Sequence, residues 1–139
     1  MARLLELGIE KFLLANCLAG VISQRLVRRL CINCRSPFQL DSKTGRELGL
    51  EGESGGHYFK PGGCRLCGYS GYQGRIAIHE VMHVGPLTSE AIYRGASDEE
   101  LDRAARQEGM ISIKEDGVNK AREGWTSLEE VLKIACTEN

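Results

Sequence analysis

The sequence has 139 residues, of which 42% are hydrophobic and 27% are charged, and its formal net charge is −1. This composition is typical of a soluble globular chain with room for one domain or two very small ones. A net charge so close to zero gives the whole chain no electrostatic argument for binding nucleic acid.

The apolar run at residues 12–22 is too short to span a bilayer. Acidic Glu6 and Glu10 precede it and no small-residue cleavage site follows, which argues against a signal peptide. We therefore expect no membrane insertion and a location in a reducing cytoplasm.

Two helices are predicted at the start of the chain. Residues 3–7 predict the end of a helix that Gly8 stops in the C′ position, and such a beginning suggests a piece of something larger. A second helix is predicted from residue 10, where apolar residues recur at helical spacing. These are Leu13, Leu14, Cys17, Leu18 and Val21. Cys17 is expected to be a small buried side chain on that face, and residues 21–30 then predict a strand.

Two Cys-x-x-Cys motifs come next, at residues 31–34 and 64–67. Two such motifs in one short chain are typical of four thiolate ligands on a single tetrahedral Zn²⁺, here Cys31, Cys34, Cys64 and Cys67. Soft sulfur suits zinc, and a two-residue gap lets neighbouring sulfurs reach adjacent corners of the tetrahedron. Gly68 is expected at positive φ, which turns backbone N–H groups toward the sulfurs.

Two other interpretations of the cysteines stay open. Disulfides would suit an exported chain, which this sequence does not resemble. A redox-active dithiol would need one motif opening a helix in a βαβ unit. The spacer at residues 35–63 is longer than the about 15–20 residues of an ordinary zinc ribbon, but zinc remains the favoured interpretation.

The segment between the first motif and Gly74 is rich in glycine and poor in large apolar side chains. Ordering such a backbone is entropically costly, and a structural zinc can offset that cost. Four thiolates leave no open position for substrate, so a structural metal is predicted. We expect Cys64→Ser to unfold residues 31–74 while the helices after Pro86 keep much of their structure.

Residues 75–84 predict a strand with Ile76 and Ile78 facing one way. His79 and His83 would lie about 13 Å apart on it, too far to share an ion. We expect this strand to pair with the earlier one, residues 24–29 against 75–81, which would close off the zinc segment as an outward lobe.

The rest of the chain is predicted to be helical, over residues 88–94, 98–108 and 112–123 and in a last helix. Ser97 and Glu100 form a capping box at the second of these helices. Thr126 with Glu129, or Ser127 with Glu130, would cap the last one. The sequence contains no Gly-x-x-x-x-Gly-Lys-Ser/Thr loop or other catalytic motif, so the chain alone is not expected to hydrolyse anything.

Several stretches resemble, in order, the C-terminal third of the type II secretion and type IV pilus assembly ATPases. They are residues 3–14 and 21–34, residues 63–80 around the second motif, residues 95–101 and 108–117 in the helical tail, and residues 126–132. The likeness covers nearly the whole chain, and residues 35–61 are its least similar part.

The resemblance implies an α+β fold: the edge of a RecA-like core (1–30 plus 75–84), an inserted tetracysteine zinc module (31–74) and a C-terminal helical subdomain (85–139). It implies a hexameric motor that binds ATP and Mg²⁺ through segments lying upstream. It also implies a cytoplasmic location at the inner membrane, against platform proteins. Arg25 and Arg75 are candidate contacts for nucleotide or a neighbouring subunit.

An alternative function is a free-standing zinc ribbon that binds nucleic acid, which the arginines around the first motif suggest (Arg25, Arg28, Arg29 and Arg35). The near-zero net charge and the lack of aromatic residues among those arginines weaken this hypothesis.

Overall fold

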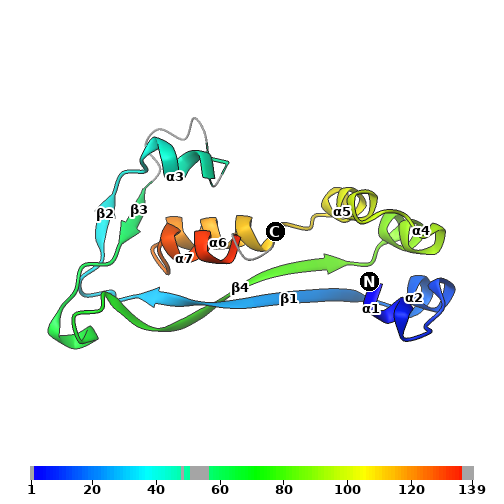
Figure 1. Cartoon of the computed structure of the whole chain (residues 1–139), viewed down its shortest axis with the longest axis horizontal. Coiled ribbons are helices and arrows are strands. Elements are labelled where there is room, and N and C mark those ends of the chain that lie inside the picture. Colours follow the sequence, from blue (N-terminus) through cyan, green and yellow to red (C-terminus); the bar gives the residue numbers. More distant parts are fainter. Residues whose placement is uncertain (1, 48, 51–56, 136–139) are drawn as a thin grey trace. The chain divides into compact units, whose positions relative to one another are not determined.

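The computed structural model describes residues 2–47, 49–50 and 57–135, which form a mixed α+β structure (Figure 1). The helices are α1 (Ala2–Glu6), α2 (Lys11–Cys17), α3 (Ser42–Glu47), α4 (Pro86–Arg94), α5 (Asp98–Gln107), α6 (Ile113–Arg122) and α7 (Leu128–Ala135), with a 3₁₀ turn η1 (Arg65–Cys67). The strands are β1 (Gly20–Leu30), β2 (Ser36–Phe38), β3 (Tyr58–Lys60) and β4 (Tyr72–His83).

The strands form two separate pairs. β1 pairs with β4, as predicted, although β4 begins at Tyr72 and is therefore longer than expected. β2 pairs with β3 in antiparallel register, with Pro37 opposite Phe59. The β2–β3 pair lies within the spacer between the two cysteine motifs, the segment that the sequence showed to be rich in glycine.

The chain divides into two compact units, Met1–Ser23 with Glu80–Ser112 and Gln24–His79 with Ile113–Asn139. These units cut across the three segments expected from the sequence. The second unit combines the cysteine-bearing segment with the last two helices. No helix in the described part of the chain has the length and apolar content needed to cross a bilayer.

The first unit is built on α2 and α4, whose side chains Leu14, Ala15 and Ile92 form its buried cluster. The predicted extension of α2 to residue 21 is wrong, because Leu18 already adopts an extended backbone and residues from Gly20 onward belong to β1. Cys17, predicted to be buried, is exposed. The capping box at the start of α5 is confirmed: the Glu100 N–H donates to Ser97 Oγ, and the Ser97 N–H donates to the Glu100 carboxylate.

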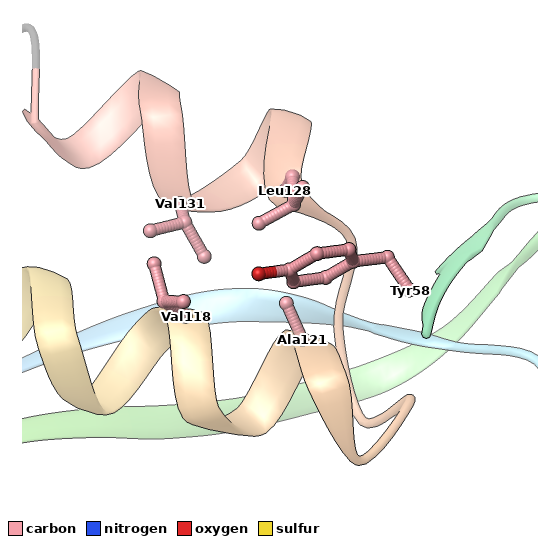
Figure 2. Close-up of a cluster of buried hydrophobic side chains, with 5 residues drawn as sticks. All are labelled: Tyr58, Val118, Ala121, Leu128 and Val131. Atoms are coloured by element: carbon pink, nitrogen blue, oxygen red, sulfur yellow. The ribbon is translucent and has the colours of Figure 1, made fainter. Parts of the chain in front are cut away.

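The second unit has its main core where the β2–β3 pair contacts the last two helices (Figure 2). The Tyr58 side chain on β3 is fully buried among Val118 and Ala121 of α6 and Leu128 and Val131 of α7. A second cluster joins Val27 of β1 and Ile78 of β4 to Ile113 at the start of α6. The expected outward lobe is therefore wrong, because the spacer supplies a core residue to the C-terminal helices.

Candidate metal centre

The four motif cysteines converge on one point. Their sulfur atoms all lie within 4.8 Å of one another, and the Sγ–Sγ distances are 3.9 Å for Cys31–Cys64, 3.8 Å for Cys34–Cys67 and 3.7 Å for Cys64–Cys67. Sulfurs on a tetrahedral zinc, with Zn–S bonds of about 2.3 Å, stand about 3.8 Å apart. A disulfide would need about 2.05 Å, and all four residues are free thiols. The sulfur positions thus fit a single four-coordinate ion.

Backbone geometry brings each sulfur to its place. Cys31 follows directly on β1, and the N–H groups of Cys34 and Arg35 both donate to its carbonyl, which closes the first turn. Cys64 directly precedes η1 and Cys67 is its last residue, and Gly68 follows at φ 58°, the left-handed conformation predicted for it. The left-handed conformation costs glycine little free energy and costs residues with a Cβ more.

Backbone N–H groups point at two of the sulfurs. The N–H groups of Cys64 and Gly71 donate to Cys67 Sγ over 3.2 Å and 3.3 Å, and that of Gly63 donates to Cys34 Sγ over 3.2 Å. The bond from the Cys64 N–H is the largest influence on Cys67 and lowers the pKa of that thiol to about 6, against the opposing effect of burial. At Cys34 the Gly63 N–H lowers the pKa, but burial and the neighbouring thiols together raise it to about 11.

Donors of this kind stabilise a thiolate, which is the form that binds a metal. Thiols crowded together without a cation resist ionising in concert. A divalent cation at the centre would supply the missing positive charge, so the donor set fits zinc.

Gly71 gives a direct test of this geometry. Its φ is 77°, its N–H donates to Cys67 Sγ, and its carbonyl accepts from the Cys31 N–H at 3.0 Å. A Cβ at this position would lie 2.4 Å from Pro61 Cβ, whereas at Gly74, with φ 74°, it would meet nothing within 4 Å.

We expect Gly71→Ala to weaken zinc binding by tenfold or more. A tenfold loss of affinity corresponds to about 1.4 kcal/mol, and a clash as close as this one costs more than that. Competition with a chromophoric chelator would measure the affinity. Gly74→Ala is the matched control, with the backbone strain but without the clash. Equal losses in the two variants would show that strain, and not the contact with Pro61, is responsible.

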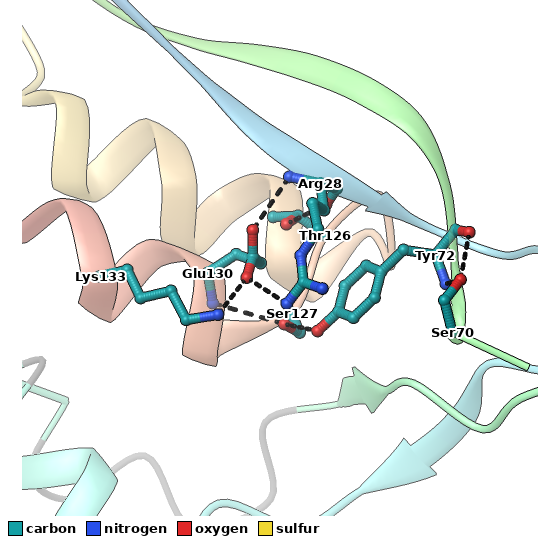
Figure 3. Close-up of polar contacts among 7 residues, drawn as sticks. All are labelled: Arg28, Ser70, Tyr72, Thr126, Ser127, Glu130 and Lys133. Carbon is teal, nitrogen blue, oxygen red and sulfur yellow. Dashed lines mark hydrogen bonds and ion pairs between the residues drawn. The ribbon is translucent and has the colours of Figure 1, made fainter.

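A polar network adjoins the centre and joins β1 and β4 to α7 (Figure 3). The Arg28 guanidinium donates to the Glu130 carboxylate over 2.8 Å, and the Arg28 backbone N–H donates to the same carboxylate. The guanidinium also lies 4.0 Å from the centroid of the Tyr72 ring. The Tyr72 hydroxyl lies 2.9 Å from Ser127 Oγ, and Lys133 also contacts Glu130. The sequence predicted Ser127 with Glu130 as one possible cap of the last helix. Ser127 Oγ does accept from the Glu130 N–H over 3.4 Å, but the Glu130 carboxylate serves this long-range network.

The other candidate residues lie elsewhere. Arg25 and Arg75 are exposed on β1 and β4. The His79 ring nitrogen lies 4.0 Å from the Asp116 carboxylate, and His83 is exposed. Neither histidine belongs to the group of four cysteines that could hold a metal in the described part of the chain.

Most arginines near the first motif make intramolecular contacts. Arg28 binds Glu130, Arg29 lies 4.8 Å from the Trp125 ring, and Arg35 lies 4.8 Å from the Phe59 ring. Three of the four arginines that suggested nucleic-acid binding therefore have partners within the chain, which favours a structural role for these three side chains.

Fold and site together define a mixed α+β protein with a four-cysteine centre inserted between two paired strands. A family model described as "Type II/IV secretion system protein" matches residues 1–133. The chain belongs to this family.

Named relatives agree with this assignment. The chain is 46% identical over 134 residues to the type IV pilus assembly ATPase PilB of Thermus thermophilus, which covers 95% of this chain and 15% of that protein. It is 39% identical over 138 residues to type II secretion system protein E of Dickeya dadantii, covering 99% and 27%. Type II secretion system ATPase E of Vibrio cholerae is 36% identical over 134 residues, covering 96% and 26%. The chain thus spans between about a seventh and about a quarter of these relatives.

Proposed function

We propose that this chain is the C-terminal part of a hexameric ATPase that powers type IV pilus assembly or type II protein secretion, and that its four cysteines hold a structural zinc. The observation that carries the proposal is the family match across residues 1–133, combined with the convergence of the four sulfurs. Four protein ligands complete a tetrahedral zinc and leave no position for substrate.

In this proposal, residues 1–30 and 75–84 form the edge of a RecA-like core, and the paired β1 and β4 support such a role. Residues 31–74 are the metal module, and residues 85–139 are the helical subdomain. ATP and Mg²⁺ would bind to upstream segments of the full-length protein. Arg25 on β1 and Arg75 on β4, both exposed, would contact nucleotide or a neighbouring subunit. The motor would work in the cytoplasm, peripheral at the inner membrane and against its platform proteins.

A chimera tests the motor assignment. This chain would replace the matching segment of the Thermus thermophilus PilB, to which it is 46% identical, and ATP hydrolysis would be measured beside the unmodified protein. We expect hydrolysis of the same order as in the unmodified protein, and none from this chain alone because it has no phosphate-binding loop.

A folded, zinc-containing chimera without hydrolysis would contradict the assignment. So would micromolar binding of DNA or RNA by this chain that falls steeply with salt, which is the behaviour of a nucleic-acid module.

A further inference from the structure

The residues on either side of the first cysteine motif both donate hydrogen bonds to the same turn. This turn lies between α6 and α7 (residues 124–127, here the α6–α7 turn). The N–H of Leu30, just before Cys31, donates to the Trp125 carbonyl over 2.9 Å. The guanidinium of Arg35, just after Cys34, donates to the Gly124 carbonyl. Two metal ligands therefore lie between the two residues that anchor this turn.

The contact at Arg35 is closely packed. Its guanidinium lies against the ring of Phe59, the neighbour of core residue Tyr58 on β3. Gly124 is buried at φ 76°, and a Cβ there would lie 2.6 Å from Arg35 Nη1 and 2.8 Å from the Phe59 ring. A side chain at position 124 would therefore require Arg35 or Phe59 to move.

The other half of the turn connects to β1 and to the second motif. The Thr126 hydroxyl donates to the Arg28 carbonyl over 2.8 Å, and Ser127 contacts the Tyr72 hydroxyl. Tyr72 directly follows Gly71, whose N–H points at Cys67 Sγ. Thr126 and Ser127 are both buried, so losing these partners would leave buried polar groups unsatisfied, which is destabilising.

We propose that the four-cysteine centre is a metal-dependent latch for the α6–α7 turn. This inference rests on the metal half of the proposed function. With metal bound, residues 30–35 and 71–72 are fixed and the turn is seated on them. Without metal, four crowded thiols have no common partner, the flanking residues lose their fixed positions, and α7 loses the anchors of its first turn. The coupling is reciprocal, so a seated turn also tightens metal binding.

The fluorescence of Trp125 can report the release of the α6–α7 turn when the metal is removed. Trp125 is the single tryptophan, lies in the α6–α7 turn, and packs under Arg29. We expect a chelator to change Trp125 emission and to speed amide exchange at residues 124–131 by a factor on the order of ten or more. Exchange in α4 and α5, which belong to the other compact unit, should change little. Hydrogen exchange with mass spectrometry resolves the two regions.

A pair of arginine variants separates the latch from general unfolding. Arg35→Met removes the contacts to Gly124 and Phe59, whereas Arg65→Met removes a matched arginine that is exposed inside the second motif. We expect both to bind one metal ion, with affinity reduced by roughly tenfold in Arg35→Met alone. In Arg35→Met, residues 124–131 should exchange fast even with metal bound.

Unchanged exchange at residues 124–131 when wild-type chain loses its metal would overturn the latch, whatever the variants do. Equal behaviour of Arg35→Met and Arg65→Met would overturn it too. If Co²⁺ gives no thiolate absorption and elemental analysis finds no metal, the metal proposal itself fails, and that result is distinct from a bound metal without coupling.

Discussion

Replacing Cys64 by serine is expected to abolish zinc binding and to unfold most of the unit that contains it. A structural zinc contributes about 10–16 kcal/mol of binding free energy, which is comparable to the whole stability of a typical domain, about 5–15 kcal/mol. Because Tyr58 is buried between α6 and α7, the loss should extend to those helices. The structure thereby narrows the expectation from sequence that the helices after Pro86 would keep much of their structure, because α6 and α7 share a core with Tyr58.

Zinc content per chain and the ellipticity of the helices would measure this effect, with α4 and α5 expected to persist. Cys17→Ser is the matched control, because Cys17 is exposed and lies in the other unit. That variant should keep its zinc and its stability. Zinc loss in the control, or retained zinc in Cys64→Ser, would contradict the assignment of the ligands.

Local signals in the sequence predicted the local parts of this structure well. The two Cys-x-x-Cys spacings predicted the converging sulfurs, Gly68 predicted a left-handed turn, and Ser97 with Glu100 predicted a capping box. In each case the residues that decide the geometry lie within a few positions of one another, so spacing alone carries the information.

Long-range contacts were not predictable from the same signals. The apolar period suggested that α2 would reach residue 21, but Gly20 joins β1 against Met82, where a Cβ would lie 2.9 Å from the Met82 carbonyl oxygen. Pairing with β4 thus overrode local helical spacing, and Cys17 became the exposed end of α2. Nothing near Tyr58 in sequence indicates that it fills a core formed by helices some 60 residues later.

Arg35 and Glu130 show the same limit. Arg35 was considered as a basic residue for nucleic acid, yet it binds the α6–α7 turn. Glu130 sits three residues after Ser127, the spacing of a capping box, but its partner Arg28 is 102 positions away. An acid on the apolar side of a predicted helix was the one available signal, since a carboxylate that becomes buried needs a cationic or hydrogen-bonding partner.

The carboxylate of Glu130 is expected to carry the second large effect on stability. Its side chain is 8% exposed and accepts hydrogen bonds from the Arg28 guanidinium, the Arg28 backbone N–H and Lys133. Burial alone would raise its pKa, but the bonds from Arg28 and Lys133 outweigh burial and lower the pKa of Glu130 to about 2. We expect Glu130→Gln to lose about 2 kcal/mol of unfolding free energy at neutral pH, less than the about 3–5 kcal/mol of a fully buried pair, because the Arg28 side chain is 48% exposed.

The pH dependence gives this prediction its sign. The pKa of Glu130 is lower in the folded chain than its ordinary value of 4.5, so its contribution is complete above pH about 5 and is lost as pH falls toward about 2. The difference in unfolding free energy between wild type and Glu130→Gln should shrink over that window, as measured by urea unfolding with Trp125 fluorescence. Metal content is measured in both chains at each pH, because metal loss in acid would itself loosen residues 124–131, which include Glu130. Glu129→Gln, an exposed neighbour, should change stability by less than about 0.5 kcal/mol at any pH. A difference for Glu130→Gln that stays constant with pH would mean that shape, and not charge, holds α7 to the β1–β4 pair.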